Sequence, residues 1–560
     1  MTLADELVAA GVPSGSPVAL VSVAGTGLAC AWHGGGGTDA TSDLAGAISA
    51  AARADPRWVL WSARDMRTTV VDAGVRLRAC WDVGAVHRLL HGAHRDDAAA
   101  VWSAARGLPE PDPPRAELDL LDLDSGDDEE PVRADGQLSR VWLQGGWARD
   151  LRTAQRWAQL LLQVYDAQHA AVAQLPDPRP GTHRRSLPVL TAYAESAASL
   201  LAVELGSVGL PVDRGAMADI LRPLIGPPPV DEAHAEARRR ARDDAVRAQF
   251  PGGADVDLRN PAQVKEMLAR VGLELPDTRS WRLEPHAASS PAVASLLAWR
   301  KAERMATTYG WGWLDRDVDG DGRLRGTWSA AEGAGRMTAS AGLHNLPAEL
   351  RSAVRAEPGH VFVRADLGQV EPRVLAVVSG DEALAQAAHD DDMYAPVAAR
   401  LGCERATAKV AVLAAMYGQT SGTAGNALRQ MERTYVRAMR YLREAEAAGR
   451  EGRPVRTYGG RLLRMQPGWG RFARNAVVQG AAAELFKAWA STVRAGLPER
   501  GQIVMCLHDE LLLHVRETHV DEARALLHAA LVATSRWWAA GSGVRFVADV
   551  AAGGSWADAH

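Results

Sequence analysis

The chain has 560 residues, more than one hydrophobic core usually supports, so we expect two or more domains. Its formal net charge is −5 at pH 7, and neither residues 1–187 nor the remainder is strongly basic, which excludes a uniformly basic nucleic-acid-binding protein. Any affinity for nucleic acid has to come from a local groove.

The cysteines and the N-terminus indicate the compartment. Cys30, Cys80, Cys403 and Cys506 are widely spaced and form no Cys-x2-Cys pair, which argues against a disulfide framework and against a structural zinc site. The chain has no uninterrupted apolar run long enough to span a membrane, and it does not start with a basic segment followed by an apolar one. We therefore expect a cytoplasmic protein with reduced thiols and no membrane segment.

Residues 1–187 predict a separate α/β domain. Short apolar runs at residues 17–23 and 58–61 predict strands, whereas residues 98–106 and 151–175 have the spacing of helices. An acidic tract at residues 117–130 follows a proline-rich segment, which is typical of a solvated loop rather than of a metal site.

Two further sets of residues have ligand-like spacing. His87, His91 and His94 would share one face of a helix, but no cysteine and no clear third-ligand motif lies near them. The run Asp315–Gly320 starts like a calcium-binding EF-hand loop, but Gly326 stands at the twelfth position, where that loop needs a glutamate. We favour an ordinary helix and a polar turn over metal sites.

The helical pattern strengthens after residue 188. Residues 189–221 and 232–250 predict long amphipathic helices. Five arginines lie on the second helix: Arg238, Arg239, Arg240, Arg242 and Arg247. A solvated face and a set of phosphate contacts fit this pattern equally well.

Residues 361–373 predict a buried strand that runs into a helix. Alternating apolar residues lead to Asp366, after which the composition becomes helical. A second aspartate lies in the triplet His508, Asp509 and Glu510, which apolar runs flank as two strands around a tight turn. Burying unpaired carboxylates costs several kcal/mol, so we expect a cation to hold them together. Two divalent metals bridged by two aspartates suit an in-line phosphoryl displacement.

One predicted helix between these aspartates presents two cations and a ring. At residues 405–417, steps of four place Arg405, Lys409, Leu413 and Tyr417 on one face. The cations come first and the ring last, so this face can hold a triphosphate at one end and a base at the other. Lysine is otherwise rare in this chain, which is consistent with a specific use for Lys409.

A later helix has a second polar face. Arg471, Asn475 and Gln479 follow the same steps of four, which usually indicates a solvated stripe. The next residues, 480–489, are mostly apolar, so this helix is partly buried. Its polar face is therefore expected to look into a cleft.

These stretches together resemble motifs A, B and C of the family A DNA polymerases, the bacterial DNA polymerase I type. Any one motif alone would be a weak signal, but here order, spacing and strand or helix context agree three times. The resemblance extends from about residue 188 to the end. It rests on Asp366…Gln369…Glu371…Arg373, Arg405…Lys409…Tyr417-Gly418 and His508-Asp509-Glu510.

The resemblance implies an α/β, multi-domain fold of the right-hand polymerase type. Its parts would be a thumb at 188–325, a palm at 326–377 and 467–560, and fingers at 378–466. Within the thumb, Glu204–Asp213 and Asn260–Gln263 look like family sequences that grip the duplex, which favours phosphate contact for the nearby arginines.

The resemblance also implies the partners: primer–template DNA, deoxynucleoside triphosphates and two Mg²⁺ ions, for which Mn²⁺ could substitute. Asp366, Asp509 and the Leu367 carbonyl would hold the metals, with Glu510 supporting them, and Lys409 would protonate the leaving pyrophosphate. The nucleotide would meet Gln369, Glu371, Tyr394, Arg405, Lys409, Leu413 and Tyr417. The DNA would meet Arg336, Arg471, Asn475, Gln479 and His508. We expect a monomer.

Residues 1–187 occupy the position of the family's RNase H-like 3′–5′ exonuclease domain. The segment Cys80–Leu90, with Asp82, resembles one of its motifs. The first strand should carry Asp-x-Glu, but it reads Val21-Ser-Val23, and the last motif is reduced to Tyr165-Asp166. A two-metal nuclease cannot work with one carboxylate, so we expect a degenerate exonuclease-like domain that does not proofread.

Two alternatives stay open. A single-subunit RNA polymerase shares the Arg-x3-Lys-x7-Tyr-Gly helix, although Glu371 matches the family A residue that blocks a 2′-hydroxyl. A non-catalytic DNA-binding relative is the other, although the carboxylates and cations all stand where the family has them. Two departures from the family pattern are Leu413, where an aromatic residue is usual, and Tyr394, where a histidine is usual.

Overall fold

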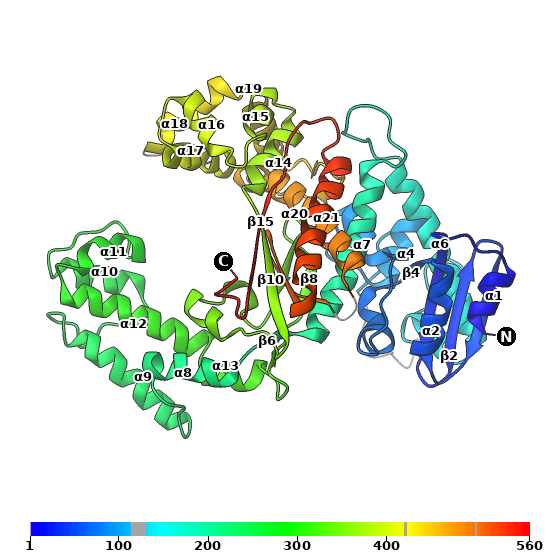
Figure 1. Cartoon of the computed structure of the whole chain (residues 1–560), viewed down its shortest axis with the longest axis horizontal. Helices are drawn as coiled ribbons and strands as arrows, with labels where there is room; N and C mark the ends of the chain where they lie inside the picture. Colours follow the sequence, from blue (N-terminus) through cyan, green and yellow to red (C-terminus); the bar gives the residue numbers. More distant parts are fainter. Residues whose placement is uncertain (1, 114–129, 419–422, 499–500, 560) are drawn as a thin grey trace.

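The computed structural model describes residues 2–113, 130–418, 423–498 and 501–559. It places an N-terminal α/β domain at one end of the molecule and a helical arm at the other (Figure 1). A central sheet lies between them, and a second group of helices stands above that sheet. The acidic tract at 117–130 lies outside the described residues apart from Glu130, which pairs with Arg156.

The N-terminal domain is a five-stranded sheet with helices on both faces. Its strand order is β3-β2-β1-β4-β5, with β1 parallel to β4 and β4 to β5. The strands are β1 (Pro17–Val23), β2 (Gly27–Trp32), β3 (Gly35–Ala40), β4 (Arg57–Leu60) and β5 (Cys80–Asp82). The helices are α1 (Leu3–Ala9), α2 (Leu44–Ala51), α3 (Val83–His91), α4 (Ala98–Arg106), α5 (Arg140–Leu143) and α6 (Leu151–Ala173). These bounds confirm the predicted strands and helices. Alternate residues of β1 are buried in two separate cores, one on each face of the sheet.

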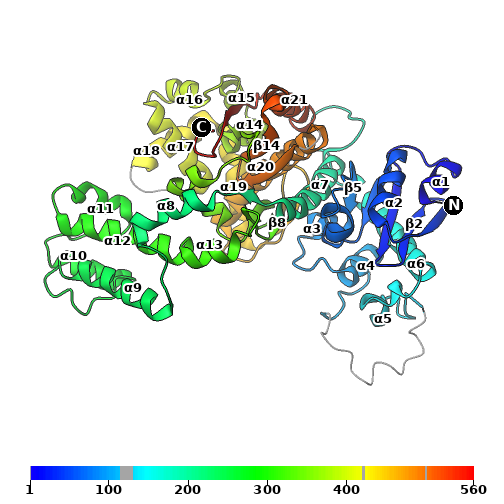
Figure 2. The same ribbon diagram turned by 60° about the horizontal axis from the view of Figure 1, so that its bottom comes forward.

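Helix α7 (Leu187–Val208) joins this domain to the rest of the molecule. It packs against β5 on one side and against α20 (Gly470–Gly496) on the other, and Figure 2 shows it between the two parts. Within the described residues, α7 is one helix whose length and apolar character would allow a membrane span. Its most apolar window is 67 % buried inside the protein, as in a core helix.

The predicted single helix at residues 189–221 is wrong. Gly209 has φ +71°, a conformation that favours glycine, and it ends α7. A short strand β6 (Leu210–Pro211) follows and pairs with β7 (Arg323–Leu324), and Asp213 then caps a new helix α8 (Arg214–Ile225). The apolar spacing continues across the break, so hydrophobicity alone conceals it.

The helical arm extends from α8 away from the central sheet (Figure 1). It continues with α9 (Glu232–Arg247), α10 (Pro261–Ala269), α11 (Ser280–Ala287), α12 (Pro291–Thr308) and α13 (Trp311–Asp317). The end of the arm has its own small core between α9, α10, α11 and α12. On α9, Arg239 and Arg242 pair with Glu303 of α12, so these two arginines hold the arm together.

The central sheet is antiparallel, in the order β13-β14-β10-β15. Its strands are β10 (His360–Leu367), β13 (Gln502–Leu507), β14 (Glu510–Arg516) and β15 (Ala548–Gly553). Helix α14 (Val370–Ser379) follows β10, which confirms the predicted strand-to-helix transition. Helix α21 (Val520–Trp538) packs on β10, β14 and β15, and the hairpin of β8 (Trp328–Glu332) and β9 (Arg336–Ala339) lies beside α20 and α7.

The second helical group stands above the sheet. It comprises α15 (Glu382–Ala387), α16 (Tyr394–Leu401), α17 (Arg405–Tyr417), α18 (Thr423–Thr434) and α19 (Val436–Glu451). The short strands β11 (Val455–Arg456) and β12 (Leu462–Leu463) then lead into α20. The predicted helix at 405–417 is confirmed with the same bounds.

Both ligand-like sets have ordinary structural roles. Helix α3 ends at His91 because Gly92 takes a left-handed conformation, so His94 does not share the helical face of His87 and His91. The EF-hand-like run is a polar turn whose carboxylates already pair with arginines: Asp315 with Arg214, Asp317 with Arg316, and Asp319 with Arg325.

A buried ionic cluster joins α7 to α20. Lys487 Nζ lies 2.9 and 2.8 Å from the two oxygens of Glu195, and Arg461 Nη2 lies 2.5 Å from Glu195 Oε2. Although burial opposes the charge, Arg461 and Lys487 hold the pKa of Glu195 below its ordinary value. Glu484 accepts hydrogen bonds from the Gly459 amide and from Thr457, but burial raises its pKa to about 7. Glu195 is therefore ionised at neutral pH, whereas Glu484 changes its protonation state there.

Glu484 should make the stability of the protein fall as the pH rises. Its pKa is about 7 in the folded state against an ordinary 4.5, so the folded state retains the proton and its advantage is lost as the pH rises from about 5 towards 8. Replacing Glu484 with glutamine removes that loss, and the variant should gain up to about 3 kcal/mol relative to the parent over this range. Thermal unfolding at several pH values checks it, and equal slopes for both proteins would contradict the assignment.

Candidate active site

The two predicted aspartates lie together at one end of the central sheet. Asp366 is near the end of β10, directly opposite Glu510 of β14. Asp509 lies in the two-residue turn between β13 and β14, where His508 takes a left-handed φ of +55°. The Leu367 amide donates to the Asp509 carbonyl at 3.0 Å, so the backbone fixes the turn against β10.

The electrostatics of this pair suit a divalent cation. Burial raises the pKa of Asp509 to about 6, and the charge of Asp366 adds to the shift. Carboxylates that destabilise each other's charge in a partly buried place are the hard oxygen ligands that Mg²⁺ prefers. Asp366, Asp509 and the Leu367 carbonyl would hold such an ion, so the residues present fit the expected metals.

Behind Asp366, an arginine and a tryptophan position the carboxylates. Arg364 Nη2 donates to Asp366 Oδ2 at 2.8 Å, and its Nε lies 3.0 Å from Glu510 Oε1. Trp556 Nε1 donates to the same Glu510 oxygen at 2.7 Å. Glu510 is thus buried, and its Oε1 contacts both Arg364 and Trp556. The sequence analysis missed Arg364, although period-two alternation places it on the same face of β10 as Asp366.

A cleft of about 270 Å³ opens beside these carboxylates. It brings together ten residues that the sequence analysis selected: Arg336, Leu367, Gln369, Glu371, Tyr394, Leu413, Tyr417, Gln479, His508 and Asp509. Those that do not line it are Asp366, Arg405, Lys409, Arg471, Asn475 and Glu510. Segments that lie far apart in the sequence therefore share one small site.

Glu371 is held by two donors inside the cleft. Arg336 Nη2 donates to its Oε1 at 2.6 Å, and the Tyr417 hydroxyl donates to its Oε2 at 3.2 Å. Burial, and then the charge of Glu371, raise the pKa of Tyr417. Arg336, which was predicted to meet DNA, and Tyr417, which was predicted to meet the nucleotide, thus both hold the Glu371 carboxylate.

The cationic face of α17 lies at the mouth of the cleft. Arg405 and Lys409 are exposed, whereas Leu413 and Tyr417 are partly buried, as the steps of four predict. Arg405 Nε donates to Asp392 Oδ2 at 2.5 Å, and this contact lowers the pKa of Asp392. The Arg405 guanidinium also lies 5.8 Å from the centre of the Tyr394 ring.

Asp392 was not selected from the sequence, yet it connects two selected residues. Besides Arg405, it accepts from Gln369 Nε2 at 3.0 Å, while the side-chain oxygen Oε1 of Gln369 accepts from the Met393 amide at 2.9 Å. Asp392 lies in the loop before α16, where no periodicity marks it. Only the folded structure shows that Asp392 contacts both Gln369, which precedes α14, and Arg405 of α17.

On α20, the polar face begins exposed at Arg471 and becomes partly buried at Asn475 and Gln479, as predicted. Arg471 Nη2 lies 3.5 Å from the Tyr417 carbonyl. The buried Arg474 donates to the Ala415 carbonyl at 2.6 Å and therefore fixes α20 to α17. His508 also lines the cleft, and burial and the charge of Arg336 lower its pKa.

Arg373 is a buried anchor of the site. Its side chain is fully buried and donates to the carbonyls of Gly368, Ala388, Asp390, Asp391 and Arg545. These carbonyls belong to the turn before α14, the loop before α16 and the segment before β15. One guanidinium thus holds three segments around the cleft.

In the N-terminal domain, Asp82 serves the backbone. It is 3 % exposed, and its oxygens accept from the amides of Ala63 and Ala85, both at 2.8 Å. Val21 and Val23 of β1, the positions at which the resemblance expects Asp-x-Glu, are buried apolar residues. Asp82 therefore acts as the cap of α3.

The overall fold is that of a right-hand polymerase domain. The structure aligns over 100 % of this chain with 98 % of the POL domain of Pol1 from M. smegmatis, solved in complex with DNA primer-template and dNTP, at a TM-score of 0.67 and 21 % identity. The sequence model of DNA polymerase family A matches residues 231–558, more than half of the chain. The chain therefore belongs to DNA polymerase family A.

Curated relatives agree with this assignment. DNA polymerase I of Chloroflexus aurantiacus is 31 % identical over 288 residues, which cover 44 % of this chain and 30 % of that protein. DNA polymerase I of Rhizobium leguminosarum is 25 % identical over 53 % of this chain and 32 % of its own length. The chain thus spans about a third of the length of these relatives.

Proposed function

We propose that the chain is a template-directed DNA polymerase that extends the 3′ end of a primer with deoxynucleoside triphosphates. The observation that carries this proposal is the meeting of Asp366 and Asp509 beside a cleft that Tyr417, Glu371 and Gln479 line. The helical arm would be the thumb, the central sheet the palm, and α15–α19 the fingers. That the chain acts as a monomer stays a prediction.

Each residue has a role that its position supports. Two Mg²⁺ ions held by Asp366, Asp509 and the Leu367 carbonyl would activate the primer hydroxyl and stabilise the departing pyrophosphate. Arg364 and Glu510 keep the Asp366 carboxylate in place. Arg405 and Lys409 would bind the triphosphate at the cleft mouth, where the exposed Lys409 can give a proton to the leaving group.

On the DNA side, the donors of α20 and His508 would meet the template and primer. Arg336 would reach minor-groove acceptors, which exist on every base pair, so that contact checks pairing without reading sequence. Its present bond to Glu371 shows that the two groups share one small volume. Binding of a nucleotide therefore requires Arg336 and Tyr417 to leave Glu371 or to share it.

Primer extension on a primed DNA template, with Mg²⁺ and the four deoxynucleotides, tests the proposal. A parallel reaction with ribonucleotides separates it from an RNA polymerase, because Glu371 lines the cleft where a 2′-hydroxyl would enter. Extension with deoxynucleotides is the expected result. Binding of DNA without extension would instead indicate the non-catalytic relative.

The N-terminal domain should not proofread. Both oxygens of Asp82 are engaged by backbone amides, and β1 offers valines where a nuclease needs carboxylates. Purified protein given a mismatched primer end and Mg²⁺, without nucleotides, should release no mononucleotide. Degradation from the 3′ end that persists in an Asp366→Ala variant would show a nuclease site that we have not recognised.

Leu413 should weaken the selection of the sugar. It lines the cleft with Glu371 and Tyr394, but it has neither the flat ring nor the hydroxyl of a tyrosine. We expect poor use of dideoxynucleotides and weakened exclusion of ribonucleotides, an effect of order 1 kcal/mol or about fivefold. Leu413→Tyr should increase dideoxynucleotide incorporation relative to the parent in single-nucleotide kinetics. An unchanged ratio would mean that Leu413 does not face the sugar.

A further inference from the structure

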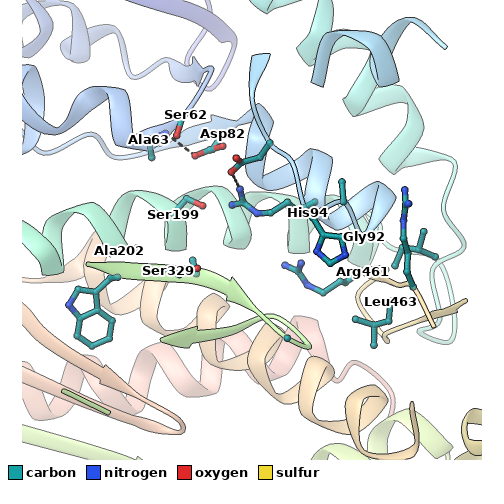
Figure 3. A pocket seen from close by; sticks show the side chains of 18 of the residues that line it. Ser62, Ala63, Asp82, Gly92, His94, Ser199, Ala202, Ser329, Arg461 and Leu463 are labelled. Carbon is teal, nitrogen blue, oxygen red and sulfur yellow. Dashed lines mark hydrogen bonds and ion pairs between the residues drawn. The ribbon is translucent and has the colours of Figure 1, made fainter. Parts of the chain in front are cut away.

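A second and larger cavity lies between the N-terminal domain and the central part of the molecule. Its volume is about 1000 Å³, and its walls come from α3, α7, the β8–β9 hairpin, the β12 segment and the start of α20 (Figure 3). None of its lining residues lines the cleft beside Asp509. A cavity of this size can hold a few nucleotides but not a duplex.

The cavity carries cations and unsatisfied polar groups. Arg464 lies at its edge, exposed, and donates to the His91 carbonyl at 2.8 Å; among the described residues no carboxylate pairs with it. Arg64, whose side chain is 70 % exposed, shares Asp96 with Arg88. The Ser199 hydroxyl on α7 lines the cavity and is buried without a hydrogen-bond partner (Figure 3).

Two aromatic side chains stand at the opening. Trp469 and Phe472, at the start of α20, are 40 % and 41 % exposed, and their rings lie 5.2 Å apart edge to face. Exposed aromatic faces beside arginines are the pattern that binds single-stranded nucleic acid: bases stack on the rings while the cations follow the phosphates.

The cavity lies next to the surface proposed to meet DNA. Phe472 follows Arg471 directly on α20, and Arg471 reaches the Tyr417 carbonyl at the cleft. Trp328 of the cavity and Arg336 of the cleft belong to one β-hairpin. A strand that left the cleft along α20 towards the start of that helix would therefore approach Trp469 and Phe472.

We propose that this interdomain cavity binds single-stranded DNA, the unpaired template ahead of the primer end. Bases would stack on Trp469 and Phe472, and phosphates would lie on Arg464 and Arg64. Asp82 lines the cavity, but its oxygens are used by the Ala63 and Ala85 amides, so the strand is held without being cut. The identity of the strand rests on the proposed function; the binding itself does not.

The test compares two primer–templates in an Asp366→Ala background, without nucleotides, by fluorescence anisotropy. One has a template overhang of ten nucleotides and the other an overhang of one. The double variant Trp469→Ala/Phe472→Ala should bind the long-overhang DNA about tenfold or more weakly and leave the short-overhang DNA unchanged. Arg464→Ala should reduce the salt dependence of the long-overhang complex alone.

Trp281→Ala is the matched control, because Trp281 is an exposed tryptophan (56 %) on the helical arm, far from the cavity. It should leave the difference between the two DNAs intact. Equal weakening of both DNAs by the double variant, or no weakening, overturns the proposal. If the parent chain binds the long-overhang DNA more tightly but extends no primer, only the proposed function is overturned. Thermal midpoints of the variants that equal that of the parent exclude a folding defect.

Discussion

Replacing either Asp366 or Asp509 with alanine should reduce primer extension by about a thousandfold or more. Each metal contact stabilises the transition state by several kcal/mol, and every 1.36 kcal/mol corresponds to a factor of ten in rate. Two metals cannot be held by one carboxylate. Steady-state extension of a primed template, with protein in excess for the slow variants, measures the loss.

Replacing Asp366 or Asp509 should not unfold the protein. Since burial and Asp366 raise the pKa of Asp509 to about 6, its charge destabilises the metal-free fold as the pH rises through that value. Asp509→Asn should therefore raise the thermal midpoint in EDTA at pH 7.5 while it abolishes extension. Loss of activity together with a lowered midpoint would mean that Asp509 supports the fold instead of the metals.

Asp521, an exposed carboxylate in the first turn of α21, provides the control. Asp521→Ala removes one negative charge from the same part of the molecule without touching β10 or the β13–β14 turn. Its extension rate should match that of the parent within about twofold. Near-parent activity in Asp366→Ala or Asp509→Ala would refute the metal assignment.

Local patterns were sufficient to predict the frame of the proposed active site. Asp366 and Asp509 stand out because ionisable residues interrupt apolar strand patterns, and both positions lie at strand ends in the structure. The face of Arg405, Lys409, Leu413 and Tyr417 follows from helical periodicity alone. The pattern of the adjacent residues is therefore enough to predict where these side chains lie.

The residues that support this frame could not be found in the same way. Asp392 contacts Arg405 and Gln369 from an irregular loop, and Trp556 reaches Glu510 across 46 positions of sequence. Arg373 has a clear place in the family pattern, but only the fold shows that its five partners are carbonyls. The end of α7 was missed because Gly209 interrupts the backbone without interrupting the apolar spacing.

The largest effect on stability is expected from Glu195. In Glu195→Gln the side chain keeps its shape, but Arg461 and Lys487 lose their carboxylate in a place where Glu195 is only 3 % exposed. Breaking a buried pair by removing one partner typically costs about 3–5 kcal/mol, since the remaining charges stay desolvated and uncompensated. Burial already lowers the pKa of Lys487 to about 8, so this lysine should lose its proton near neutral pH in the variant.

Glu204 provides a matched comparison on the same helix. Its carboxylate pairs with Arg494 of α20 at 2.6 Å, so Glu204→Gln breaks the same type of contact between the same two helices. Glu204→Gln leaves one buried cation, Arg494, which keeps a hydrogen bond to the Leu77 carbonyl, whereas Glu195→Gln leaves two, so this variant should lose less. Thermal unfolding of both variants at pH 7 decides the point. Equal losses would show that the contact between α7 and α20 matters, and not the buried charge of Glu195.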